Sequence, residues 1–560
     1  MYVFAHIIAL IQKSISSLNF KYSKRSRLAL LMVVVASAAA IVLTSRAESN
    51  PFGWKAEPSL IKIEDSVAGS KKAVFTKESK GQVTVHAAGR GKPFLNLQDG
   101  RPMTVTFRGD QSALVALQSG ATQARSLASA DFDRNGTPDV VAGYGFSGAG
   151  IITLQNGNPD AFAPANDSVF VRMQQGYNPA SLLPNADVYS VPVTPDFLVT
   201  GNFNNDTEKD VLFAAKGGAL YLMAGNGAGR FAEPQQIMLP GVVTALAAGG
   251  FRAADGFTDL AVGVSGAGGD TLLIFDDAAN GFSDAVAQYQ LSAPASAIEF
   301  GGLDDDPFQD VAAATGSEVL VVHGWGRKES VAPESRVERV NVGPGVRGLA
   351  LGEFTWDRQG LTEIAALTYD GTVHVVGQGK ADTRPFSEVE AAQRTRGNLK
   401  PQKRESLDLE SVQSWRLSQA GDWKDQKQFL GSNLSSDLPK PLMRTNLSYR
   451  EIDEVMLVGQ TQSKLEIMRS VAPSEKDLAE VSAAVTGDGL AKTTLDVEST
   501  PVAVLTLPRK LNGVTDVLVL DATSTEAAIV PNAPNTTITV DRTDDPNGGS
   551  LGAGSAWTVG

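Results

Sequence analysis

Short apolar runs recur along this chain, and many of them begin directly after an acidic turn. In the clearest copy, the apolar run VVA follows the turn DFDRNGTPD, which spans Asp131 to Asp139, and the short run LASA precedes it. Runs of this length, bounded by Gly, Asn and Asp, predict β-strands rather than helices. The pattern therefore predicts pairs of strands joined by acidic turns.

The acidic turn repeats along the chain, and each copy ends in a carboxylate that leads into an apolar run. Five copies end at Asp139, Asp210, Asp259, Asp310 and Glu363, and two fainter copies end at Glu454 and Asp516. Several copies lie roughly 50 residues apart, and about 40 to 50 residues are needed for one four-stranded blade of a β-propeller. The sequence therefore predicts an all-β protein, a β-propeller of about seven blades.

The remaining segments set the predicted domain organisation. Residues 121–379 are predicted to form blades one to five, and residues 441–535 blades six and seven. Residues 46–120 are β-rich and could supply the outer strand that closes the ring. Residues 380–440 form a charged insertion, predicted to be partly disordered because it has little apolar area to offset the entropy of ordering. Residues 536–560 are a tail or a truncated further module.

The repeats resemble the FG-GAP and VCBS repeat family, calcium-loop propellers related to the head of integrin α chains. The resemblance rests on the D-x-D-x-N-G-x-x-D-V core at Asp131 to Val140, on its relaxed copies, and on the G-N-G-x-G-x-F ending at Gly225 to Phe231. It implies that bound calcium is structural and pins the acidic loops. It also implies that the propeller presents a surface to its ligands.

Three acidic turns carry oxygen donors at alternating positions, as a loop that binds Ca²⁺ through six to eight oxygen ligands requires. The expected calcium ligands are Asp131, Asp133, Asn135, Thr137 and Asp139 in the first turn, Asn202, Asn204, Asp206, Glu208 and Asp210 in the second, and Asp304, Asp306, Phe308 and Asp310 in the fourth. Amides replace two carboxylates in the second turn, and Gly302 stands where the fourth turn needs its first ligand. The amides predict weaker binding in the second turn, and the fourth turn is expected to form an incomplete site.

Acidic turns also form without metal, because Asp and Asn side chains accept hydrogen bonds from nearby backbone groups. The third and fifth copies are longer than the others, leaving Asp255 with Asp259 in one and Glu353 with Asp357 and Glu363 in the other. This altered spacing favours plain hairpin turns in those two copies.

Catalytic motifs are not evident in the sequence. It has no G-x-S-x-G motif, and its two similar stretches, 145–148 and 263–266, are interpreted as hairpin glycines. His86, His323 and His374 stand alone in β-like segments, as packed or surface histidines commonly do. The paired carboxylates are interpreted as parts of calcium loops in preference to the acid and base of a glycosidase. The sequence therefore predicts no catalytic residues.

Composition and the N-terminal residues narrow the function further. The net charge of -13 argues against a nucleic-acid partner, and the lack of cysteine excludes disulfides and cysteine–zinc sites.

The N-terminal segment contains an apolar run, Leu28 to Leu43, that follows the basic residues Lys21, Lys24, Arg25 and Arg27. This run is shorter than the roughly 20 residues of a bilayer span. Residues 1–45 are therefore predicted to be a leader helix, with a cleaved export signal favoured over an uncleaved membrane anchor.

The sequence as a whole favours an exported, monomeric, calcium-binding propeller that binds a protein or glycan at the cell surface and does not act as an enzyme. Membrane contact is expected only through the N-terminal segment, if that segment is uncleaved. Two alternatives stay open. One is a secreted carbohydrate-active enzyme, a lyase or hydrolase, with its site in the central funnel or an insertion. The other is a membrane-anchored assembly scaffold.

Overall fold

A computed structural model gives the fold of the chain from residue 85 onward. The structure describes residues 85–87, 95, 97–390 and 423–532, apart from 163, 165, 176, 178, 205, 252–256, 277–281, 283–284, 305, 307, 327–335, 344, 359, 361, 380–381, 383, 388, 432–437, 449, 451, 460–462, 473–489, 498 and 509–514. The chain divides into two compact units, Met1–Lys77 and Glu78–Gly560. Only the second contains described residues. The predicted leader and the tail at 536–560 lie outside the described residues.

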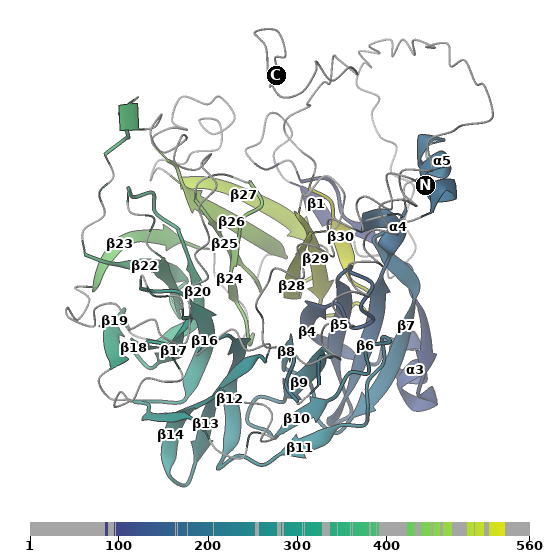
Figure 1. Ribbon diagram of the computed structural model, residues 1–560, viewed down its shortest axis with the longest axis horizontal. Helices are drawn as coiled ribbons and strands as arrows, with labels where there is room; N and C mark the ends of the chain where they lie inside the picture. The colour runs from purple at the N-terminus through teal and green to yellow at the C-terminus, as the bar shows by residue number, and fades with distance from the viewer. Residues whose placement is uncertain are drawn as a thin grey trace, which may run out of the picture. The chain divides into compact units, whose positions relative to one another are not determined.

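The second unit is a seven-bladed β-propeller, as the repeat predicts (Figure 1). Each blade is a sheet of four antiparallel strands, and blades one and six carry a fifth strand. From the inner strand outward, blade one contains β4 (Gln123–Ala130), β5 (Asp139–Phe146), β6 (Ala149–Gly157), β7 (Leu182–Val191) and β3 (Thr106–Gly109). Blade two contains β8 (Phe197–Gly201), β9 (Asp210–Ala214), β10 (Leu220–Met223) and β11 (Gln235–Ile237), and blade three contains β12 (Val242–Gly249), β13 (Asp259–Gly266), β14 (Gly269–Phe275) and β15 (Ala287–Gln290). Blade four contains β16 (Ala295–Gly301), β17 (Asp310–Thr315), β18 (Glu318–Val322) and β19 (Val337–Asn341).

Blades five to seven follow the same order. Blade five contains β20 (Val346–Gly352), β21 (Glu363–Thr368), β22 (Thr372–Gln378) and β23 (Trp423–Leu430). Blade six contains β24 (Leu442–Thr445), β25 (Glu454–Leu457), β26 (Lys464–Ser470), β27 (Leu490–Val497) and β1 (Val85–Ala87). Blade seven contains β28 (Pro501–Pro508), β29 (Thr515–Asp521), β30 (Ala528–Val530) and β2 (Arg101–Pro102). Three short helices, α3 (Gln111–Gln118), α4 (Pro159–Phe162) and α5 (Asp167–Gln174), lie outside the sheets.

The core lies between neighbouring blades. The second strand of a blade, such as β17 or β21, is buried along its whole length because other blades cover both of its faces. Such strands read as continuous apolar runs instead of alternating ones. One apolar cluster, for example, joins Phe203 and Leu212 of blade two to Val262 of blade three. Blade-to-blade packing thus explains the runs that follow the acidic turns.

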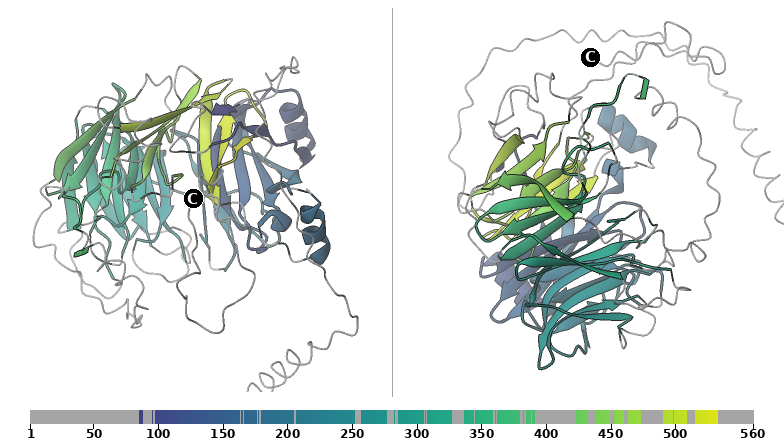
Figure 2. Two further views of the ribbon diagram at one scale, coloured as in Figure 1. Left: turned by 90° about the horizontal axis from the view of Figure 1, so that it is seen from above. Right: turned by 90° about the vertical axis from the view of Figure 1, so that its left-hand side faces the viewer.

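The ring closes through the N-terminal part of the second unit. β2 pairs with β30, with Arg101 opposite Ile529, so the last blade takes its outer strand from residues that precede the first blade. The inner strands β28 and β4 are neighbours, and the yellow strands of the last blade lie beside the purple and blue strands of the first in both views of Figure 2. β1 adds a fifth strand to blade six by pairing with β27.

Blade five ends later in the sequence than its apolar pattern predicts. β23, residues 423–430, lies within the range predicted as the charged insertion, yet it pairs with β22 as the outer strand of blade five. Its sequence, WKDQKQFL, is mostly polar because an outer strand has one edge in solvent. The predicted boundary at 380–440 is therefore too wide at its C-terminal end.

Among the described residues, the structure contains no helix that is both long and apolar enough to cross a membrane.

Candidate functional site

The carboxylates that end the acidic turns occupy one equivalent position in all seven blades. Each lies at or next to the start of its blade's second strand and is at most 3% exposed: Asp139, Asp210, Asp259, Asp310, Glu363, Glu454 and Asp516. In blades one to six the carboxylate accepts a hydrogen bond of 2.5 to 2.8 Å from a backbone N–H in the preceding loop. The donors are Phe132, Phe203, Phe251, Leu303, Phe354 and Leu447. These anchor carboxylates therefore fix the loops that precede them.

Four anchor carboxylates also hold the end of the third strand, and one of them is Asp516, which accepts from the Asn532 N–H at 2.8 Å. The second oxygens of Asp139, Asp210 and Asp310 accept from the backbone N–H of Gly157, Gly225 and Gly324, at 2.7, 2.8 and 3.0 Å. A Cβ on Gly225 would lie 2.0 Å from the Lys209 carbonyl oxygen, so only glycine allows this approach. The anchor thus ties together three strands of its blade without a metal ion.

Burial raises the pKa of the anchor carboxylates, although their hydrogen bonds to backbone amides oppose the change. The pKa rises to about 7 for Asp139, to about 6 for Asp210 and to about 7 for Glu363. Nearby carboxylates, such as Asp133 and Asp131 beside Asp139, raise the pKa further. A cation in such a loop would favour the ionised form.

The first acidic loop brings its predicted ligands together. Carboxylate oxygens of Asp131, Asp133 and Asp139 lie within 4.8 Å of one another. The loop also forms hydrogen bonds with itself. The Asn135 N–H donates to Asp131 and Asp133 at 3.1 Å each, and the Thr137 N–H donates to the Asn135 side-chain oxygen at 2.7 Å. The loop therefore has both the donor chemistry of a cation site and the bonding of a metal-free turn.

The second loop, described apart from residue 205, is held together differently. The Asn202 side-chain amide donates to the Asp206 carbonyl, and the Asn204 side-chain amide donates to Asp210. The Asp206 carboxylate accepts from the Glu208 N–H at 2.7 Å. The Glu208 side chain pairs with Arg134 of the first loop, whose Nε donates to it at 2.6 Å. Adjacent acidic loops are thus connected across the blade boundary.

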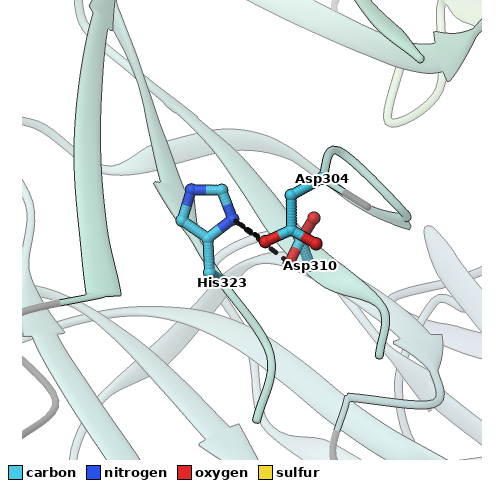
Figure 3. A group of neighbouring side chains, drawn as sticks. All are labelled: Asp304, Asp310 and His323. Atoms are coloured by element: carbon cyan, nitrogen blue, oxygen red, sulfur yellow. Dashed lines mark ion pairs between the residues drawn. The ribbon is translucent and has the colours of Figure 1, made fainter. Parts of the chain in front are cut away.

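The fourth loop lies against a buried histidine (Figure 3). His323 follows β18, and its side chain is 4% exposed. Figure 3 shows its ring pointing toward Asp304 and Asp310, and Nδ1 lies 3.2 Å from one carboxylate and 3.4 Å from the other. Asp306 and Phe308 belong to the same loop, where the Phe308 N–H donates to Asp306 at 2.8 Å.

The electrostatics of the fourth loop are unlike those of the other loops. Burial lowers the pKa of His323, but its contacts with Asp304, Asp310 and Glu338 outweigh burial and raise the pKa to about 12. Burial raises the pKa of Asp306 to about 7, with a further contribution from Asp304. The sequence alone did not identify His323 as a site residue, because it lies outside the acidic loop in the chain. The pairing of β17 with β18 places it beside that loop.

The third and fifth loops are only partly described. Asp255 lies outside the described residues. In the fifth loop, the Gly360 N–H donates to Asp357 at 2.5 Å, while Glu363 accepts from the N–H groups of Phe354 and Thr355. These contacts are those of an Asx-type turn closed by its anchor carboxylate.

A cavity of about 330 Å³ follows the axis of the ring. It is lined by the inner strands of all seven blades, mostly with apolar side chains. Its charged lining residues form two ion pairs, Arg125 with Asp196 at 3.7 Å and Lys440 with Glu299 at 2.8 Å. Among the described residues that line it, there is no histidine.

The two stretches with spaced Gly and Ser belong to ordinary hairpins. Residues 145–148 run from the end of β5 into a two-residue turn before β6, and residues 263–266 lie at the end of β13. Neither stretch leads from a strand into a helix, as a nucleophile elbow does.

Comparisons with known proteins give a structural similarity but no family match. No protein-family model matches this sequence, and no curated protein is similar to it in sequence. Among solved structures, the chain is similar to that of BBS1N in complex with ARL6DN, soaked with lead, with 11% identity and a TM-score of 0.40. The match covers 72% of this chain and 90% of that chain.

Proposed function

We propose that the protein is an exported binding module, in which a calcium-pinned propeller presents its loops to a protein or glycan at the cell surface without transforming it. We also propose that the protein is a monomer and that its N-terminal segment is an export signal. Calcium acts as a structural ion in the first and second loops.

The observation that favours binding over catalysis is the set of residues that line the central cavity. Funnel-shaped propeller sites that hydrolyse or eliminate need convergent acid and base groups. In the described lining, Asp196 and Glu299 each lie beside a cationic side chain, so neither is placed as one of a pair of carboxylates. The surface offered to a ligand is then the loop rim.

The rim of blades one and two is built to hold its shape. Arg134 of the first loop pairs with Glu208 of the second. The Gly229 N–H, in the glycine-rich turn of blade two, donates to the Phe132 carbonyl at 3.1 Å. A surface ordered before binding loses less entropy when a ligand docks.

Calcium fits the donor set of the first loop. Asp131, Asp133 and Asp139 are hard oxygen donors that already converge, and Asn135 adds an amide oxygen. A divalent cation would offset the repulsion among these carboxylates. Asn202 and Asn204 make the second loop a less charged and weaker site.

The direct experiment offers the labelled full-length protein to glycan arrays and to intact cells, in calcium and in chelator. The proposal expects saturable binding in calcium, weaker binding in chelator, and bound glycans of unchanged mass. A matched variant, Arg134→Gln with Glu208→Gln, is expected to weaken binding with little loss of stability, since Arg134 is exposed to solvent and ion pairs at the surface contribute about 1 kcal/mol or less. Release of shortened or unsaturated glycans would overturn the proposal in favour of an enzyme.

Export is tested separately by the mass of the mature protein recovered from its native source. Loss of Leu28 to Leu43 is expected. Retention of that segment would replace export with membrane anchoring.

A further inference from the structure

The fourth acidic loop contains a nitrogen donor where the first loop has only oxygen. We propose that Asp304, Asp310 and His323 form a binding site for a divalent first-row transition metal of the zinc type. This site is distinct from the calcium proposed for the first two loops and does not depend on it.

The spacing of the three ligand atoms fits such an ion. Ligand atoms of Asp304, Asp310 and His323 all lie within 4.8 Å of one another. The His323 Nδ1 is 3.2 and 3.4 Å from the two carboxylates, and ligands on a tetrahedral zinc ion with bonds of about 2.1 Å lie about 3.4 Å apart. Charge-assisted hydrogen bonds are shorter, at about 2.7 to 2.9 Å.

The histidine is buried and aimed at this point. Among the described residues, neither ring nitrogen of His323 has a hydrogen-bond partner of acceptable geometry, although carboxylates lie nearby. A buried polar group without such a partner destabilises the fold, and a metal bond to Nδ1 would remove that cost.

Glu338 lies on the side of the imidazole where metal-binding histidines commonly have a carboxylate. The His323 Nε2 faces Glu338 of β19 at 3.5 Å, and the indole N–H of Trp423 donates to the other oxygen of Glu338. Metal-bound histidines commonly direct their second nitrogen at a carboxylate, which fixes the tautomer and leaves the first nitrogen for the ion.

The carboxylate ligands are also held in place by the backbone. Asp310 accepts from the N–H groups of Leu303 and Gly324, and Asp304 accepts from the Asp306 N–H at 3.0 Å. Both side chains are therefore positioned before any ion arrives.

Comparison of blades one and four explains why the metal differs. The residue before the anchor-bound glycine is Asn156 in blade one, where its amide donates to Asp133 at 3.0 Å. The same position in blade four is His323, while Gly302 removes the first oxygen ligand. Imidazole suits zinc, copper, iron and nickel, whereas calcium prefers six to eight oxygens.

The test uses the chelator-treated full-length protein, with Co²⁺ followed by visible absorption and Zn²⁺ by calorimetry. We expect one tight site per chain that gives a tetrahedral cobalt spectrum and is displaced by zinc. His323→Gln and Asp304→Asn are expected to abolish the spectrum. Glu338→Gln is expected to weaken binding by about 10- to 100-fold, as the loss of an orienting carboxylate commonly does.

Two matched controls are expected to retain the cobalt spectrum: His374→Gln, which removes a histidine paired with Asp425, and Asp131→Asn in the first loop. An unchanged spectrum in His323→Gln, no stoichiometric binding, or displacement of cobalt by a modest excess of calcium would overturn the proposal. Should His323→Gln fail to fold, anomalous scattering at the zinc edge from zinc-soaked wild-type crystals decides. A peak at Nδ1 supports the site, and its absence refutes it.

Discussion

The backbone N–H of Phe132 donates to a carboxylate oxygen of Asp139 at 2.7 Å, and other residues repeat this contact in the next five blades. The second oxygen of Asp139 accepts from Gly157. The last carboxylate of the acidic turn is therefore a structural element of the blade, whether or not its loop binds an ion.

Replacing Asp139 by alanine should destabilise the protein strongly, even in chelator. It leaves the buried N–H groups of Phe132 and Gly157 unpaired, at a cost of about 3 kcal/mol. Urea unfolding measures the loss. Asp131→Ala is the matched control, because its carboxylate bonds Asn135 and the exposed Gly136, where water can substitute. Equal losses from both variants would refute the structural role of the anchor.

Glu363 should make stability depend on pH. Burial raises its folded-state pKa from 4.5 to about 7, so the folded protein holds a proton that the unfolded chain releases. Its contribution is complete below about pH 4.5 and is lost as the pH rises to about 7. Urea unfolding across this window should show a flatter pH profile for Glu363→Gln than for the wild type.

The glutamine in that variant can keep the contacts of Glu363. Its oxygen can accept from Phe354 and Thr355, and its amide can donate to the Thr355 hydroxyl. Glu233→Gln, at an exposed position, is the control and should follow the wild-type profile. Parallel profiles for Glu363→Gln and the wild type would contradict the raised pKa.

The turn between β5 and β6 can be made more stable. Ser147 and Gly148 connect the paired residues Phe146 and Ala149, with φ of +51° and +83°. Positive φ at both positions is typical of a type I′ turn, which favours Asn-Gly. Ser147→Asn should therefore raise stability by about 0.5 to 1 kcal/mol, and Gly148→Ala should lower it by about 1 kcal/mol. A loss in the first variant, seen in thermal or urea unfolding, would contradict the turn assignment.

The repeat could be recognised from sequence because the residues that form each acidic turn are close together in the chain. The Phe or Leu that donates to the anchor and the carboxylate that accepts are seven to nine residues apart in the first five copies, so the motif is local. The apolar run that follows reflects burial between blades. Together they predicted seven blades.

Two features could not be found in this way. β23 is polar, because it is an outer strand, and it lies far along the chain from β22. His323 follows Asp310 by one hairpin and reaches the loop only through the register of β17 with β18. Aligning the glycines at the ends of the third strands, Gly157, Gly225 and Gly324, would have shown a histidine before the last of them.

The most direct test of the proposed function is a calorimetric calcium titration of the purified protein beside Asp133→Ala and the control Asp357→Ala. Asp133 belongs to the loop with three convergent carboxylates, and Asp357 to a loop interpreted as a plain turn. We predict binding with dissociation constants of about 10⁻⁴ M, as in extracellular calcium modules, with one site lost in Asp133→Ala and none in Asp357→Ala. No heat of binding, or the same heat in all three proteins, would contradict a calcium-pinned binding module.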